Sequence, residues 1–128
     1  MGERIRVLLV DEDPDVLELT ETFLEREDED IEVLTERSGS AALEVLEGEA
    51  VDCVVSDYRM PEMDGLELHE AVTDREPLPF FLFTASADRE TTEAGEAAGV
   101  TGVVQKGAGT DHYARLAERI RAAVEAAE

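Results

Sequence analysis

The sequence is poor in residues that crosslink a chain or anchor it in a membrane. Cys53 is its single cysteine among 128 residues. One cysteine cannot form an internal disulfide, and it excludes a zinc site built from several thiolates. The longest apolar runs, such as Val7–Val10, fall far short of the ~20 residues that span a bilayer. Because the N-terminal residues Met1–Arg4 also lack the apolar core of a signal peptide, we expect a cytoplasmic protein.

Positive charge is scarce throughout the chain. The sequence has 33 acidic and 11 basic residues, for a net charge of −22. Such a surface repels phosphate backbones and anionic lipid, so we expect no direct binding of nucleic acid or membranes. The acidic residues alternate with apolar positions and do not gather in one tail, which indicates the solvated surface of a folded protein. The length and the 43% hydrophobic content predict a single domain over residues 1–128.

Lysine is almost absent, because ten of the basic residues are arginine and Lys106 is the only lysine. An acidic composition with almost no lysine resembles that of proteins from salt-accumulating halophiles. In those organisms salt screens the repulsion between surface carboxylates. We therefore expect a halophilic source.

Short apolar runs alternate with helical stretches along the chain. Five runs are typical of strands that are covered on both faces: Ile5–Val10, Ile31–Thr35, Val51–Ser56, Phe80–Phe83 and Gly102–Val104. Apolar residues at helical spacing, or a helix-capping residue, follow each run. This alternation predicts an α/β fold with a doubly wound, five-stranded parallel sheet and helices on both faces.

The helical stretches also predict which side chains turn inward. The helix that begins near Pro14 is expected to carry an apolar face made of Val16, Leu19, Phe23 and Leu24. His69 and His112 have no partner pattern and are expected on helix surfaces.

Polar side chains stand where four of the strands end. Asp11, Glu12 and Asp13 follow the first strand, Asp57 ends the third, Thr84 the fourth, and Lys106 comes after the fifth. The carboxyl ends of parallel strands lie at one edge of the sheet, so these residues are expected together there. In open parallel sheets this is the edge at which ligands bind. Adjacent carboxylates repel one another unless a divalent cation lies between them, which predicts a Mg²⁺ (or Mn²⁺) site. A carboxylate can also attack phosphorus, while Lys106 and Thr84 would bind phosphoryl oxygens.

Four segments carry a resemblance to a known family. They are Leu8–Pro14, Ser56–Gly65, Phe83–Ala85 and Gln105-Lys106. In this order and spacing they resemble the receiver domain of two-component response regulators, over about Arg4 to Val124. The resemblance implies a flavodoxin-like receiver fold and Mg²⁺-dependent transfer of a phosphoryl group from a sensor histidine kinase, a phosphotransfer protein or a small phosphodonor. It also implies that the domain is not an enzyme beyond autocatalytic phosphorylation and dephosphorylation.

The resemblance assigns roles by position. It implies that Asp57 is the phosphoacceptor, Lys106 the phosphate-binding lysine and Thr84 the switch hydroxyl. It implies a metal site made of Asp11, Glu12, Asp57 and the backbone carbonyl of Arg59.

Two positions depart from the family pattern. Val103 stands where the family often has an aromatic residue whose rotamer reports phosphorylation, and Gly107 stands where a proline usually follows the lysine. Neither change affects phosphotransfer, but together they predict a weaker or different switch. The stretch Gln105–Gly107 and the acidic composition resemble archaeal receivers that precede sensor or kinase modules. This implies an archaeal source and a downstream output, sensor or kinase module as partner.

Two other functions fit part of the pattern. A haloacid-dehalogenase-like phosphatase also has a strand-end Asp-x-Asp, a hydroxyl residue and a lysine, and it would make Asp11 the nucleophile. That function needs a further acidic pair for the metal, whereas Asp111 is the only aspartate after Lys106, and the chain leaves no room for a substrate-selecting cap. The second alternative is a binding module that keeps the fold and works without phosphorylation.

The charge pattern predicts that salt stabilises the fold. The free energy of unfolding, measured by urea titration, is expected to rise from low salt to molar KCl, because screening weakens the repulsion between carboxylates. Equal stability with and without molar salt would remove the halophile hypothesis.

Overall fold

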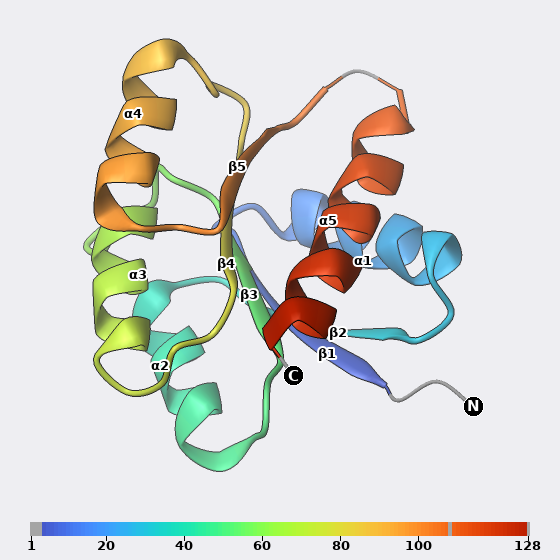
Figure 1. Ribbon diagram of the computed structural model, residues 1–128, viewed down its shortest axis with the longest axis horizontal. Helices are drawn as coiled ribbons and strands as arrows, with labels where there is room; N and C mark the ends of the chain where they lie inside the picture. Colours follow the sequence, from blue (N-terminus) through green and yellow to red (C-terminus); the bar gives the residue numbers. More distant parts are fainter. Residues whose placement is uncertain (1–3, 108, 128) are drawn as a thin grey trace.

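The computed structural model describes residues 4–107 and 109–127, along which five strands alternate with five helices (Figure 1). In chain order they are β1 (Ile5–Val10), α1 (Pro14–Glu27), β2 (Ile31–Glu36), α2 (Gly39–Gly48), β3 (Cys53–Ser56), α3 (Gly65–Thr73), β4 (Phe80–Thr84), α4 (Arg89–Ala98), β5 (Gly102–Gln105) and α5 (Asp111–Ala127). The predicted alternation is confirmed. β3 begins at Cys53 and not at Val51, because the Asp52 carboxylate accepts the backbone N–H of Arg6 at 2.8 Å.

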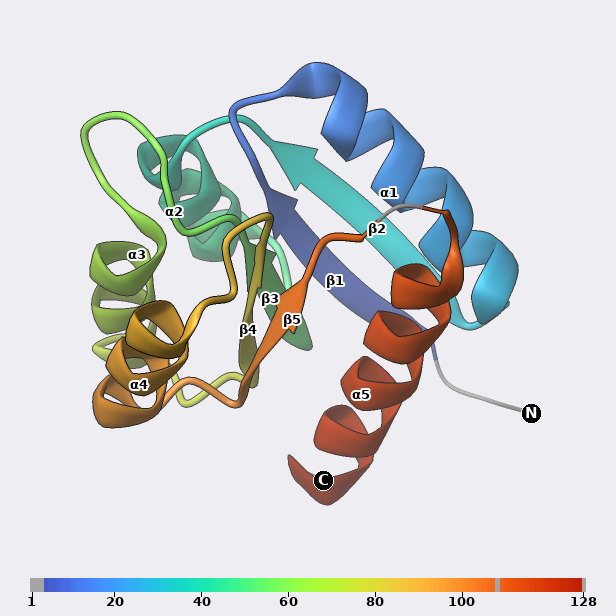
Figure 2. The same cartoon turned by 90° about the horizontal axis from the view of Figure 1, so that it is seen from above.

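The five strands form one sheet in the order β2-β1-β3-β4-β5, and every neighbouring pair is parallel. The chain starts in the interior at β1, moves out to β2, and then crosses over to β3, β4 and β5 (Figure 2). In register, Val7 of β1 lies opposite Val33 of β2 and Cys53 of β3. The doubly wound parallel sheet predicted from the sequence is therefore confirmed.

Helices cover both faces of the sheet. α1 and α5 lie on one face and α2, α3 and α4 on the other (Figures 1 and 2). Successive strand residues point to opposite faces, so the strands contribute to two cores. Val7 and Leu9 of β1 pack toward α1 and α5, whereas Leu8 and Val10 join the core on the other face. Burial on both faces explains why the strands appear in the sequence as continuous apolar runs.

The inward face of α1 differs from the prediction. Leu17, Thr20 and Leu24 are buried, whereas Leu19 is 50% exposed. Residues 17, 20 and 24 follow the three- and four-residue spacing of one helix face. Leu19 comes two residues after Leu17, which is about 200° around the helix at 3.6 residues per turn. The prediction of Leu19 as a core residue was wrong.

The predicted surface positions of both histidines were also wrong. His69 and His112 are each 6% exposed. The His69 ring packs edge-on against Phe80 on the α3 side, with centroids 4.9 Å apart, and His112 packs against Phe83 on the α5 side. Burial lowers the pKa of both histidines, so their neutral rings serve as aromatic core groups.

Arg121 attaches α5 to the turn between α1 and β2. Its Nε and Nη2 each donate to an oxygen of Asp28 at 2.7 Å, and Nη2 also donates to Asp30 at 2.7 Å. This fork-like pairing matches the planar guanidinium. It fixes the position of α5 relative to α1.

Each edge strand receives a side chain from a neighbouring helix. On β2, the Val33 N–H donates to the Glu25 carboxylate of α1 at 3.0 Å. On β5, the Val103 carbonyl accepts from the Arg119 guanidinium of α5 at 3.3 Å. These bonds satisfy backbone groups on the two outer strands.

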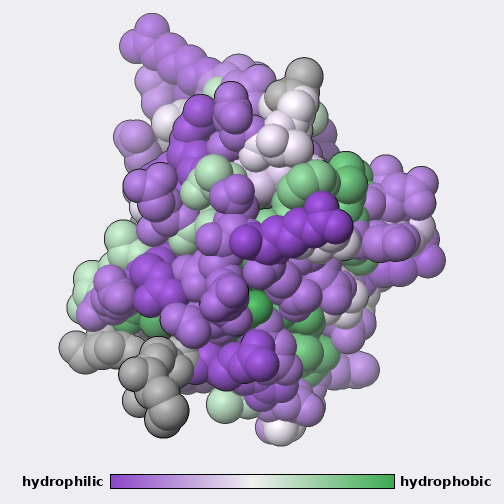
Figure 3. Space-filling model, turned by 90° about the vertical axis from the view of Figure 1, so that its right-hand side faces the viewer, coloured by the Kyte–Doolittle hydropathy of each residue, from purple (hydrophilic) through white to green (hydrophobic). Residues whose placement is uncertain are grey.

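The surface over α1 and α5 is mostly hydrophilic, with small apolar islands between the charged side chains (Figure 3). This agrees with the spread of acidic residues along the chain. Within residues 4–107 and 109–127, no helix has both the length and the apolar character needed to cross a membrane.

Two buried threonines should respond in opposite directions to replacement by valine. Thr20 is fully buried, and its hydroxyl finds no hydrogen-bond partner in the described part of the chain. Thr20→Val is expected to raise the free energy of unfolding by about 1 kcal/mol, because it removes an unsatisfied polar group. Thr91→Val is expected to lower it, because the buried Thr91 hydroxyl hydrogen-bonds the Asp88 carboxylate. Urea unfolding at one salt concentration tests the pair, and a loss of stability in both variants contradicts the prediction.

Candidate functional site

The carboxyl ends of four strands bring the predicted polar residues to one edge of the sheet. Asp11 follows β1, Asp57 follows β3, Thr84 ends β4, and Lys106 follows β5. The sheet hydrogen bonds continue past the strand ends, since the Asp57 N–H donates to the Val10 carbonyl at 2.9 Å and the Lys106 N–H to the Thr84 carbonyl at 2.8 Å. The sheet itself thus positions these residues.

Lys106 lies between two carboxylates. Its Nζ is 2.6 Å from Asp11 Oδ2 and 3.6 Å from Asp57 Oδ2. The three side chains are largely withdrawn from solvent, with 18%, 4% and 16% exposure for Lys106, Asp11 and Asp57. The ammonium also lies 5.7 Å from the centroid of the Phe83 ring. The only lysine of the chain therefore offsets part of the negative charge of the acidic pair at the end of the sheet.

Backbone N–H groups orient both carboxylates. Asp11 Oδ1 accepts from the N–H of Asp13 at 2.9 Å, and Asp57 Oδ1 accepts from the N–H of Tyr58 at 2.8 Å. Each carboxylate therefore directs its other oxygen, Oδ2, to Lys106.

The protonation of Asp57 reflects competing influences. Burial raises the pKa of Asp57, and the Lys106 ammonium opposes this effect. The neighbouring Asp11 carboxylate raises the pKa further, while the Tyr58 N–H lowers it. The net shift is upward, so burial and Asp11 together outweigh the cation.

Thr84 is buried at the same edge, at the end of β4. Its hydroxyl oxygen accepts from the Ser86 N–H at 3.3 Å. The hydroxyl proton can still donate to an incoming oxygen.

The side chains of Glu12 and Arg59 are exposed, in contrast to the buried Asp11 and the partly buried Asp57. They line a hollow of about 390 Å³ together with Tyr58, Met60, Pro61 and Asp64. The Arg59 guanidinium lies 5.5 Å from the Tyr58 ring centroid. The structure thus places both predicted residues beside the site, on its open rim.

The described side chains at this edge include two carboxylates that suit Mg²⁺, but they do not form a preassembled metal cluster. In the described ranges, no three acidic, histidine or cysteine side chains stand close enough to form a preassembled metal cluster. Asp11 and Asp57 nevertheless direct oxygens to one cation, the Lys106 ammonium. Mg²⁺ is commonly held by one or two carboxylates, with water completing its shell, so this pair fits that ion.

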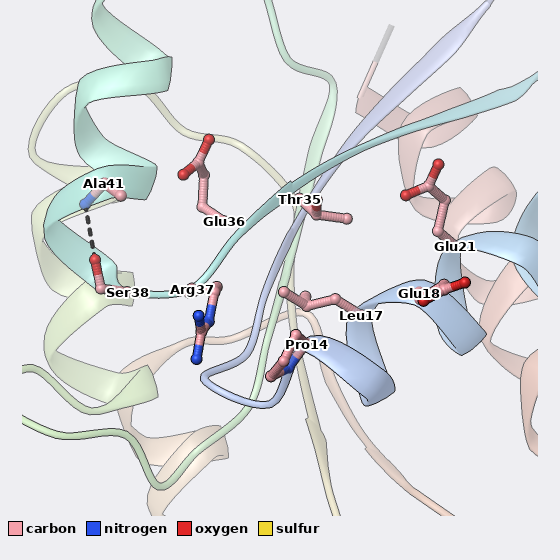
Figure 4. A pocket seen from close by; sticks show the side chains of 9 residues that line it. All are labelled: Pro14, Leu17, Glu18, Glu21, Thr35, Glu36, Arg37, Ser38 and Ala41. Carbon is pink, nitrogen blue, oxygen red and sulfur yellow. Dashed lines mark hydrogen bonds between the residues drawn. The ribbon is translucent and has the colours of Figure 1, made fainter.

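A second hollow, of about 470 Å³, lies between α1, the end of β2 and the start of α2 (Figure 4). Its lining includes Pro14, Leu17, Glu18 and Arg37, and none of the predicted site residues. It adjoins the site, because the Arg37 guanidinium of its lining donates to the Glu12 carbonyl at 3.3 Å.

Sequence reasoning missed two aromatic neighbours of the site. Phe83 lies beneath the Lys106 ammonium, and His112 stacks on Phe83. Phe83 belongs to an apolar strand run and His112 was expected on a helix surface, so neither position gave a sign of contact with the site.

The response regulator receiver domain matches residues 7–121 of the chain. Because this match covers most of the sequence, the chain belongs to the receiver domain family of response regulators. Receiver domains act in phosphorelay signalling, generally bind Mg²⁺ at an acidic pocket, and are generally not enzymes apart from their own phosphorylation. The comparisons give the phosphatase alternative no support.

Several longer proteins share this domain. The chain is 42% identical to the transcriptional regulatory protein GlrR of Escherichia coli K12 over 80 residues, which cover 62% of the chain and 18% of GlrR. It is 32% identical over 107 residues to a protein-glutamate methylesterase/protein-glutamine glutaminase of Bradyrhizobium diazoefficiens, covering 81% of the chain and 29% of that protein. The chain thus spans less than a third of these two curated relatives.

Solved receiver domains have the same fold. The receiver domain of the Francisella response regulator 1452 superposes with a TM-score of 0.84 at 21% identity, covering 98% of this chain and 100% of that one. The chemotaxis response regulator CheY4 of Vibrio cholerae superposes with a TM-score of 0.78 at 27% identity, covering 91% and 98%. These likenesses confirm the predicted receiver fold.

Replacing Asp57 by asparagine is expected to stabilise the protein at neutral pH. The folded state raises the pKa of Asp57, so folding loses stability as pH rises from the ordinary aspartate pKa of about 4 to the raised value. Asp57→Asn removes this loss. At pH 7 the free energy of unfolding of Asp57→Asn is therefore expected to exceed that of the wild type. This difference should shrink as pH falls toward 4.

Urea unfolding across this pH range, at constant high salt, measures the difference. Asp74→Asn is the control, because Asp74 is exposed at the end of α3. Lower stability of Asp57→Asn at pH 7 would contradict the prediction.

Proposed function

We propose that this receiver domain accepts a phosphoryl group on Asp57 from a sensor histidine kinase or phosphotransfer protein. One observation carries the proposal: the Lys106 ammonium is 3.6 Å from Asp57 Oδ2 and 2.6 Å from Asp11 Oδ2. A cation held beside a carboxylate is suited to bind the oxygens of a phosphoryl group transferred to that carboxylate.

In the transfer, Asp57 Oδ2 attacks the phosphorus of the donor. A bond forms between this oxygen and phosphorus, and the bond from phosphorus to the donor breaks, with its electron pair leaving on the donor group. The Lys106 ammonium moves from the free carboxylates to the phosphoryl oxygens. The Thr84 hydroxyl donates a hydrogen bond to another of these oxygens, so its orientation changes with phosphorylation.

The residues assigned to the metal are Asp11, Glu12, Asp57 and the backbone carbonyl of Arg59. Bound there, Mg²⁺ (or Mn²⁺) supplies positive charge toward the phosphoryl oxygens. Asp11 and Asp57 fit this role because their carboxylates already share one cation. Glu12 lies next to them on the exposed rim.

The proposed partners follow from the family. Receiver domains interact with histidine kinases and output domains. For this chain we propose a sensor kinase or phosphotransfer protein upstream and an output, sensor or kinase module downstream. The net charge of −22 supports the absence of direct nucleic-acid or membrane binding, and it supports a high-salt cytoplasm, in particular that of a halophilic archaeon.

Phosphorylation by acetyl phosphate tests the proposal directly. Intact protein incubated with acetyl phosphate and Mg²⁺ in molar KCl is expected to gain one phosphoryl group by mass. Asp57→Ala is expected to lose this gain, because the variant lacks the accepting oxygen. The exposed Asp74→Ala should gain the group as wild type does.

The remaining outcomes separate the alternatives. A phosphoryl group that survives in Asp57→Ala and disappears in Asp11→Ala would identify Asp11 as nucleophile, as in the phosphatase alternative. A folded wild-type protein that gains nothing from acetyl phosphate or from a histidine kinase would point to a binding module that works without phosphorylation.

A further inference from the structure

His112 is a buried ring next to the site that the proposed transfer does not use. It lies in the first turn of α5 and is 6% exposed. Its ring stacks on Phe83, with centroids 5.8 Å apart and planes at 24°. On its own helix it contacts the Tyr113 ring, with centroids 3.9 Å apart. The imidazole is therefore held between β4 and α5.

Phe83 connects His112 to Lys106. The Lys106 Nζ lies 5.7 Å from the centroid of the ring on which His112 stacks. At this distance the negative face of an aromatic ring attracts a cation. Because Phe83 is 2% exposed and directly precedes Thr84, its ring has little freedom to move. The ammonium and the imidazole thus share one aromatic neighbour.

The backbone after Lys106 provides a second contact. A Cβ atom placed on Gly107 would lie 3.5 Å from His112 Nδ1 and 3.9 Å from its Cγ. The chain that carries the lysine side chain therefore runs beside the imidazole. His112 therefore stacks on the ring under the ammonium, and any side chain on Gly107 would meet its imidazole.

Packing alone does not explain an imidazole at this position. His112 Nδ1 is buried, and among residues 4–107 and 109–127 it finds no hydrogen-bond partner. A phenyl ring would fill the same aromatic surroundings without an unsatisfied nitrogen. What the imidazole adds is a proton-binding group that stacks on Phe83 and lies beside the chain at Gly107.

The charges around His112 decide its state. Asp111 and Arg115 are its charged neighbours on α5, β4 presents the uncharged Phe83, and Lys106 lies across that ring. Burial lowers the pKa of His112 most, Arg115 lowers it further, and Asp111 opposes both. The ring is therefore neutral at neutral pH, where Lys106 is the one cation over Phe83 among the residues that the structure describes.

We propose that neutral His112 is a positioning residue for Lys106. By supporting Phe83 and Gly107, His112 keeps the Lys106 ammonium between Asp11 and Asp57. Protonation of His112 displaces this ammonium. An imidazolium would place a second positive charge on the ring that Lys106 uses, and the two cations would repel each other. The consequence for phosphorylation rests on the function proposed for Asp57. The contact itself can be tested without phosphorylation.

The single lysine makes that test direct. In protein labelled with ¹³C and ¹⁵N at lysine and histidine, Lys106 gives one side-chain NMR signal. This signal is expected to shift at the pH at which the His112 signal titrates. In His112→Phe that step is expected to vanish, because a phenyl ring keeps the packing and binds no proton. Persistence of this step at the same pH in His112→Phe overturns the proposal. A separate step from the Asp57 carboxylate, 3.6 Å from Lys106 and with a raised pKa, is expected in both proteins.

His69 provides a matched control. It is as buried as His112 and packs edge-on against Phe80 on the other face of the sheet. His69→Phe is expected to leave the pH-dependent shift of the Lys106 signal unchanged. The variant also shows which of the two histidine signals belongs to His69. Loss of the Lys106 step in His69→Phe would overturn the assignment to His112.

Phosphorylation provides the second readout. His112→Ala is expected to slow phosphorylation of Asp57 by acetyl phosphate roughly tenfold or more, because small misplacements of a catalytic group are costly. As pH falls, the phosphorylation rate of the wild type is expected to drop when His112 binds a proton, whereas the rate of His112→Phe is expected to hold to lower pH. A wild-type rate in folded His112→Ala overturns the positioning role.

The two proposals fail in different ways. If the wild-type protein is never phosphorylated, the function proposed for Asp57 fails, and the titration of Lys106 still decides the role of His112. If His112→Ala does not fold, the titration of His112→Phe decides it.

Discussion

The Lys106 ammonium between Asp11 and Asp57 is the interaction on which the functional edge depends. Parallel strands lie about 4.8 Å apart, so a sheet that ends β1 and β3 in aspartates forces two buried carboxylates together. The backbone N–H groups of Asp13 and Tyr58 hold one oxygen of each carboxylate, and the cation takes the other. In the proposed phosphotransfer, the phosphoryl group would add negative charge to this balance, and a metal held by the carboxylates would add positive charge.

Most of the fold follows from the apolar pattern, and the differences have physical causes. Apolar runs predicted all five strands. The central strands β1, β3 and β4 are buried on both faces, and the edge strands β2 and β5 are partly buried. The inward face of α1 was misjudged because Leu17 and Leu19 have equal hydrophobicity, and only packing against the sheet selects Leu17. The histidines were placed outside because a neutral imidazole cannot be told from a charged one by sequence.

The site could be predicted to the same depth as the strands that carry it. Asp11, Asp57, Thr84 and Lys106 come together because each stands at a strand end. The positions of exposed side chains such as Glu12 do not follow from strand register, and the roles of all the site residues stay predictions. His112 could not be foreseen, because its contact with Phe83 arises from the docking of the apolar face of α5 on the sheet.

The two edge strands have a consequence for how copies of this protein stay apart. A charge of −22 keeps molecules separated in dilute buffer, but in molar salt the Debye length falls to about 3 Å and that repulsion is lost at contact distance. Open strand edges would then be free to pair between molecules. Glu25 on Val33 and Arg119 on Val103 occupy backbone groups on both edges. Local hydrogen bonds thus protect the sheet against aggregation under conditions in which surface charge cannot.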